Sequence, residues 1–105
     1  MARKKGHSVN QFTINRKTFS IRLTDHAEIR LFQRKIDLFR VTGAILALGE
    51  ERILAYKNSN RDVLIQDKAN NFAVVITIDY NTITIITIID SADCWAKNGT
   101  DVINL

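Results

Sequence analysis

The sequence predicts an α+β domain, in which helices and strands occupy separate stretches of the chain. Apolar residues alternate with polar ones over residues 11–24, recur at helical spacing over residues 25–48, and alternate again from residue 50 onward. Turn-rich segments separate the later strands, and short connections favour antiparallel neighbours. The expected order is an N-terminal strand, two helices and then a four-stranded antiparallel meander.

A chain of 105 residues suits one domain with its own hydrophobic core. We expect residues 1–10 to form a basic flexible tail and residues 11–105 to form the domain. No apolar run is long enough to span a membrane, and no apolar segment of a secretory signal follows the basic N-terminus. The single cysteine, Cys94, cannot form an internal disulfide, which fits a cytoplasmic location.

Residues 11–24 form either a short hairpin or one strand with an irregular start, because the polar segment 15–17 interrupts their alternation. The pattern then becomes helical. Thr24 or Asp25 can act as the N-cap, and Glu28 can complete a capping box. The apolar residues expected on the inner side of this first helix are Ala27, Ile29, Leu31, Phe32 and Ile36.

A second helix is expected over residues 38–48, with Asp37 as its N-cap and Gly49 just beyond its end. Four strands should follow, over residues 51–57, 62–68, 72–79 and 82–90. The last strand is rich in β-branched residues, which predicts a central strand buried on both faces. Strict alternation puts one polar residue, Thr87, in a row with Ile83, Ile85 and Ile89. The remaining tail should pack partly on the sheet.

Positive charge is concentrated in the first third of the chain. Residues 1–35 hold nine Lys and Arg and two acidic residues, which gives a net charge of +7. Residues 36–105 hold six Lys and Arg and nine acidic residues, which gives a net charge of −3. This asymmetry favours a polyanion or an acidic protein as partner, although an ordinary basic surface would look the same. The two histidines and one cysteine do not suggest a metal site, and four scattered glycines cannot build a phosphate loop. We therefore expect neither a metal nor a cofactor.

The strongest chemical feature is the row His26, Arg30 and Arg34, four residues apart on one helix face that lacks large apolar residues. Arginine binds phosphate through two hydrogen bonds, and histidine exchanges a proton near neutral pH. Together they suit cleavage of RNA through its 2′-hydroxyl, a route that needs no metal. From the spacing alone, a solvated outer helix face explains the row at least as well.

The segment TDHAEIRLFQRKID resembles the motif of the DUF4258 family, which is related to the BrnT and RelE types of ribonuclease toxin. The resemblance covers roughly residues 19–90 and depends on seven positions: His26, Ala27, Arg30, Arg34, Ile36, Gly49 and Thr87. It implies a sheet with two helices on one face, possible endoribonuclease activity, and a site of His26, Arg30, Arg34 and Thr87. Lys35 departs from it, since glycine is common there, and the tail after Asp90 is additional.

The first hypothesis is a toxin-like ribonuclease that cleaves RNA without a metal. Small toxins of this kind often pair with an antitoxin, so an acidic antitoxin is a possible partner. His26 would act as general base or acid, Arg30 and Arg34 would hold the phosphate, and Thr87 would orient a group or bind a phosphate oxygen. The residues expected to attract RNA are Arg3, Lys4, Lys5 and Lys35. The second hypothesis is a non-catalytic regulator or inhibitor from a phage or mobile element that binds nucleic acid or protein. The third is an assembly module that pairs through a sheet edge.

Overall fold

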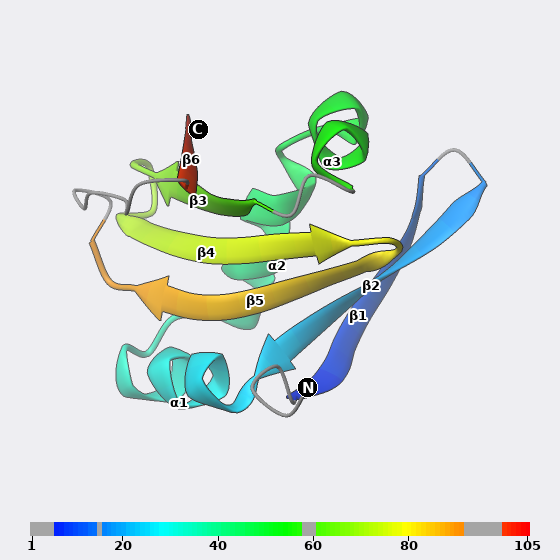
Figure 1. Ribbon diagram of the computed structural model, residues 1–105. Coiled ribbons are helices and arrows are strands. Elements are labelled where there is room, and N and C mark those ends of the chain that lie inside the picture. Colours follow the sequence, from blue (N-terminus) through cyan, green and yellow to red (C-terminus); the bar gives the residue numbers. More distant parts are fainter. Residues whose placement is uncertain (1–5, 15, 58–60, 92–99) are drawn as a thin grey trace.

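The computed structural model describes residues 6–14, 16–57, 61–91 and 100–105, and it confirms the predicted α+β class (Figure 1). Within these residues, six strands form one sheet: β1 (Gly6–Ile14), β2 (Lys17–Thr24), β3 (Asp62–Asp67), β4 (Phe72–Asp79), β5 (Thr82–Ile89) and β6 (Thr100–Asn104). Three helices accompany it: α1 (Asp25–Gln33), α2 (Leu38–Leu46) and α3 (Glu50–Tyr56). No helix in the described part of the chain is long and apolar enough to cross a membrane.

The sheet is mixed, with the strand order β1-β2-β5-β4-β3-β6. β1 and β2 form an antiparallel hairpin, and β3, β4 and β5 form an antiparallel meander. Parallel pairing joins β2 to β5 and β6 to β3. β5 therefore lies inside the sheet, as its β-branched composition predicts.

The prediction of two helices and a four-stranded meander is wrong in detail, because residues 51–57 do not form a strand. Glu50–Tyr56 form α3, in which Glu50 and Glu51 occupy the first turn, where negative charge favours a helix. Ile53 is the buried residue of this helix. Gly49, expected just beyond the end of the second helix, has φ +86° and is the N-cap of α3, a backbone conformation that glycine adopts without strain.

The sequence predicts either a hairpin or a single strand for residues 11–24, and the structure has the hairpin. Phe12 lies opposite Phe19 on the neighbouring strand, and the two rings stack with their centroids 5.6 Å apart. Residues 6–10, predicted to belong to the tail, form the first half of β1. The additional C-terminal segment also returns to the sheet, since residues 100–104 pair with β3.

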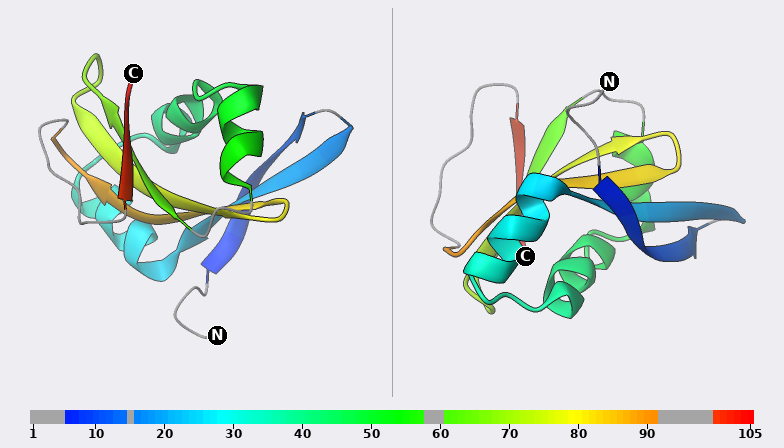
Figure 2. Two further views of the ribbon diagram at one scale, coloured as in Figure 1. Left: turned by 45° about the horizontal axis from the view of Figure 1, so that its top comes forward. Right: turned by 90° about the horizontal axis from the view of Figure 1, so that it is seen from below.

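One face of the sheet carries the main core, and α2 and α3 cover it, as the two views in Figure 2 show. α2 contributes the buried side chains of Val41, Ala44 and Ile45, and the buried Leu48 follows the end of the helix. From the sheet, the largest fully buried side chains of this cluster are Phe19, Phe72, Ile21, Ile65, Ile76, Ile83, Ile85 and Ile88.

A bulge in β5 changes which residues share a face. Ile76 lies opposite Ile85 while Val75 lies opposite Thr87, so Ile86 is an extra residue on β5. The buried row therefore continues from Ile85 to Ile88, which is 1% exposed, whereas Ile89 is only half-buried. Strict alternation, which placed Thr87 and Ile89 in this row, is wrong beyond Ile85.

The first helix buries fewer apolar residues than expected. Ala27 is buried, and Leu31 and Ile36 pack against the core in part. Ile29 and Phe32 instead face solvent, with 54% and 87% of their surface exposed. The reason is its position, because α1 runs along an edge of the sheet rather than across a face (Figure 1).

Candidate functional site

α1 takes the place of a missing strand beside β5. β2 pairs with β5 only from Thr82 to Ile85, and the chain then turns into α1, which follows the second half of β5 (Figure 1). Thr24 fixes this arrangement. Its hydroxyl accepts a hydrogen bond from the Ala27 amide (3.0 Å), which makes it the N-cap, and donates to the carbonyl of Ile86 (3.0 Å).

This geometry brings two of the predicted site residues together. His26 Nε2 lies 3.1 Å from the Thr87 hydroxyl, in an exposed position. The bulge at Ile86 and the cap at Thr24 set the distance, since one places Thr87 and the other places the first turn of α1. The hydrogen bond restrains the imidazole while leaving its other nitrogen available.

The two arginines of the row differ in their surroundings. Arg30 is half-buried, and its only side-chain partner in the described residues is Gln33 Oε1, at 3.4 Å. Arg34 forms an ion pair with Asp90, with 3.2 Å between Nη1 and Oδ2. The Nε atom of Arg34 is buried and has no hydrogen-bond partner there. Arg30 is thus the more available cation beside His26.

Lys35 has the backbone conformation that glycine favours. α1 ends in a Schellman motif, in which the Ile36 amide donates to the Leu31 carbonyl (3.2 Å) and the Lys35 amide to the Phe32 carbonyl (3.3 Å). Lys35 is the residue after the cap, with φ +54°. The Cβ atom of a lysine makes this backbone conformation unfavourable. The Lys35 side chain is exposed at the surface, where the chain turns toward α2.

This turn borders a polar cleft of about 370 Å³. The cleft lies between the α1–α2 turn, the β3–β4 turn and the end of β5. Its lining residues are Arg34, Lys35, Ile36, Asp37, Arg40, Asn70, Asn71, Phe72 and Asp90. Sequence reasoning identified two of its three cations, Arg34 and Lys35, and missed Arg40 and the acceptor Asp90. The Asn70-Asn71 pair was a visible turn signal, but its proximity to α1 is a tertiary feature.

Arg3, Lys4 and Lys5 lie outside the described residues, as does Cys94. Among the residues that are described, no three His, Cys, Asp or Glu side chains gather as a metal ion would need.

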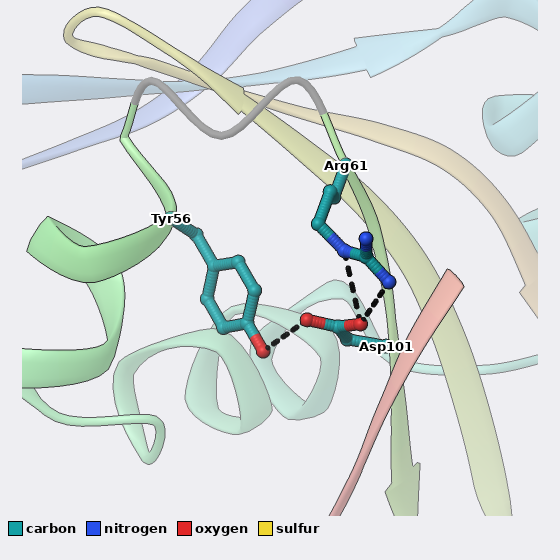
Figure 3. Close-up of polar contacts among 3 residues, drawn as sticks. All are labelled: Tyr56, Arg61 and Asp101. Carbon is teal, nitrogen blue, oxygen red and sulfur yellow. Dashed lines mark hydrogen bonds and ion pairs between the residues drawn. The ribbon is translucent and has the colours of Figure 1, made fainter. Parts of the chain in front are cut away.

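A second polar cluster, which the sequence did not reveal, joins α3 to the strand β6 (Figure 3). The Tyr56 hydroxyl donates to Asp101 Oδ2 (2.8 Å), and Arg61 donates to Asp101 Oδ1 from Nε (3.0 Å) and from Nη2. The hydrogen bond from Tyr56, together with Arg61, lowers the pKa of the Asp101 carboxyl. The same hydrogen bond raises the pKa of Tyr56 above 10.0. Each of the three groups has a hydrogen-bond partner within the cluster, which therefore fastens β6 to the domain.

Comparisons of the chain with protein-family models, with curated proteins and with solved structures found no match.

Proposed function

We propose that this protein is a small toxin-like ribonuclease that cleaves RNA through the 2′-hydroxyl, with His26 as its general base. The observation that supports this is the 3.1 Å contact between His26 and Thr87. It lies on the helix face that also carries Arg30, one turn further along. A restrained imidazole beside an available guanidinium is the minimum that this chemistry requires.

The proposed reaction begins with the His26 tautomer that carries its proton on Nε2. Nε2 then donates to the Thr87 hydroxyl, and Nδ1 is free to take the proton from the 2′-hydroxyl. The 2′-oxygen attacks the phosphorus as the bond to the 5′-oxygen breaks, and water supplies the proton for that oxygen. The products are a 2′,3′-cyclic phosphate and a 5′-hydroxyl, and no step uses a metal ion.

Arg30 supplies the charge that the transition state needs. Its guanidinium would hold the non-bridging phosphate oxygens, where negative charge increases during the attack. Arg34 lies two turns from His26, about 12 Å along the helix axis at 1.5 Å per residue. Because Asp90 already binds Arg34, we propose that Arg34 contacts the strand away from the cleaved bond.

A second candidate function is a non-catalytic module that binds an acidic protein, such as an antitoxin. Two observations favour it. The Arg34–Asp90 pair removes one cation from the row. Large apolar side chains are also exposed on α1 and α2, a feature typical of protein-binding surfaces. These side chains are Ile29, Phe32, Phe39 and Leu46.

The proposal is tested by the ends of the RNA products. Purified protein is incubated with RNA in EDTA, and the new 3′ ends are identified by mass spectrometry. We expect 2′,3′-cyclic phosphates, and we expect Arg30→Gln to slow their formation strongly while Arg52→Gln, an exposed arginine on α3, has no effect. Products with other ends, or none with any RNA, would favour the non-catalytic function.

A further inference from the structure

The cleft at the end of α1 combines a concave shape with unsatisfied positive charge. Its volume of about 370 Å³ is within the range of small-ligand sites. Such sites are usually lined by apolar groups, whereas seven of the nine residues that line this cleft are charged or amide-bearing. A cavity with this lining suits a charged group rather than an apolar one.

Three cations and two carboxylates line the cleft, so its net charge is positive. Asp90 is neutralised by Arg34, and the Asp37 carboxylate accepts the Phe39 amide (3.0 Å) as the N-cap of α2. Lys35 and Arg40 are exposed and have no ion-pair or side-chain hydrogen-bond partner in the described residues. They are the two cations of the cleft that are free to bind a ligand.

We infer that this cleft binds a phosphate group of an RNA strand, at a point separate from the phosphate held by His26 and Arg30. Lys35 and the Arg40 guanidinium are the principal contacts, and the buried Nε of Arg34 is a third donor that still has no partner in the described residues. The inference rests on the proposed function for the nature of the strand, but binding here does not require cleavage.

Two further features support this assignment. Lys35 keeps a charged side chain at a position where glycine would relieve backbone strain, and strain of this kind is often found at functional sites. On the opposite side of the cleft, Asn70 is held by the buried Asp67, which accepts from its backbone amide (3.2 Å) and from Nδ2 (2.9 Å). The second hydrogen of Nδ2 remains as a positioned neutral donor.

The test measures binding of a short 2′-O-methyl RNA, which cannot be cleaved through the 2′ position, across a series of salt concentrations. Arg40→Gln and Lys35→Gly should each weaken binding several-fold at low salt. Each should also reduce the slope of log affinity against log salt by about 0.7, the value for one lost phosphate contact on a single strand. Lys35→Gly should also raise the melting temperature, so loss of the fold cannot explain its weaker binding.

Arg52→Gln serves as the matched control, because Arg52 is an exposed arginine on α3, at the other end of the sheet (Figure 1). Wild-type affinity in both cleft variants would overturn the inference, even if His26 proved to be catalytic. Conversely, weaker binding in both variants without any RNA cleavage would support the cleft and reject only the ribonuclease. Binding of polyglutamate in place of RNA, lost in Arg40→Gln, would show that the cleft binds an acidic protein instead.

Discussion

Thr24 has two structural roles at the junction of strand and helix. Its hydroxyl caps α1 through the Ala27 amide and satisfies the carbonyl of Ile86, at the point where β5 has lost its neighbouring strand. Without that hydroxyl, the buried Ala27 amide and the partly buried Ile86 carbonyl each lose this hydrogen bond, and the first turn of α1 is no longer tied to the bulge. The position of His26 relative to Thr87 therefore depends on the hydrogen bonds of Thr24.

Replacing Thr24 tests this dependence. Thr24→Val keeps the shape but removes both hydrogen bonds, and we expect it to lower the free energy of unfolding by about 1–3 kcal/mol. Thr24→Ser, which keeps the hydroxyl, should lower the free energy of unfolding much less. The measurement is chemical denaturation of both variants. Equal losses would show that the methyl group, and not the hydroxyl, stabilises this junction.

At the scale of elements, the bulge in β5 determines which of two adjacent isoleucines supports the core. Ile88 is 1% exposed, whereas Ile89 is half-buried. We expect Ile88→Ala to cost about 2–5 kcal/mol, as large-to-small core substitutions do. Ile89→Ala should cost clearly less. The two losses of stability are measured by thermal or chemical unfolding of the variants. A larger loss in Ile89→Ala than in Ile88→Ala would mean that β5 keeps strict alternation.

The same strand illustrates how far the sequence could predict the fold. Its β-branched composition gave a central strand correctly, because burial on both faces favours such residues. The bulge depends on pairing with β4, which the pattern within β5 does not encode. The seven residues 51–57 have adjacent apolar positions that suit either period, so their pattern does not distinguish a strand from a helix, whereas Glu50 and Glu51 in the first turn favour the helix that forms.

From residue spacing, the site could be predicted only where its residues are neighbours along one helix. Helical spacing put His26, Arg30 and Arg34 in one row, and the family resemblance added Thr87, which does lie beside His26. The partners that change the chemistry come from distant segments. Asp90 reaches Arg34 from the end of β5, and Asn70 faces the cleft from the β3–β4 turn. No period within α1 could reveal either of them.

At the scale of the whole molecule, the cluster of Tyr56, Arg61 and Asp101 holds the outermost strand β6 on the sheet (Figure 3). Tyr56 and Arg61 lower the pKa of Asp101, so its contribution to stability is complete above the unfolded value of about 3.8 and is lost as the pH falls through the lower folded value. Tyr56 has a raised pKa, so its contribution is present below 10.0 and is lost as the pH rises through its folded value. The attachment of β6 should therefore be constant across neutral pH.

Asp101→Asn tests this attachment. At neutral pH the variant should melt below the wild type, because the amide cannot replace the carboxylate that Arg61 and Tyr56 bind. The difference in melting temperature should begin to shrink below about pH 3.8, where the carboxyl of the unfolded chain takes up a proton, and should disappear below the lower folded pKa, where the folded wild-type carboxyl is neutral too. A difference that stays constant down to strongly acidic pH would show that the charge of Asp101 does not stabilise β6.

His26 and two arginines of the row lie along α1 and its C-cap, and the proposed function depends on whether His26 transfers a proton. The most direct measurement compares His26→Gln with the wild type in two assays: single-turnover cleavage of RNA, and binding of a 2′-O-methyl RNA that cannot be cleaved. Glutamine keeps a similar size and hydrogen-bonding capacity but cannot exchange a proton at neutral pH. A general base at His26 predicts that cleavage falls by about 100-fold or more while binding stays within a few-fold of the wild type. Cleavage at the wild-type rate in His26→Gln would contradict it, and the row of His26, Arg30 and Arg34 would then be a binding surface only.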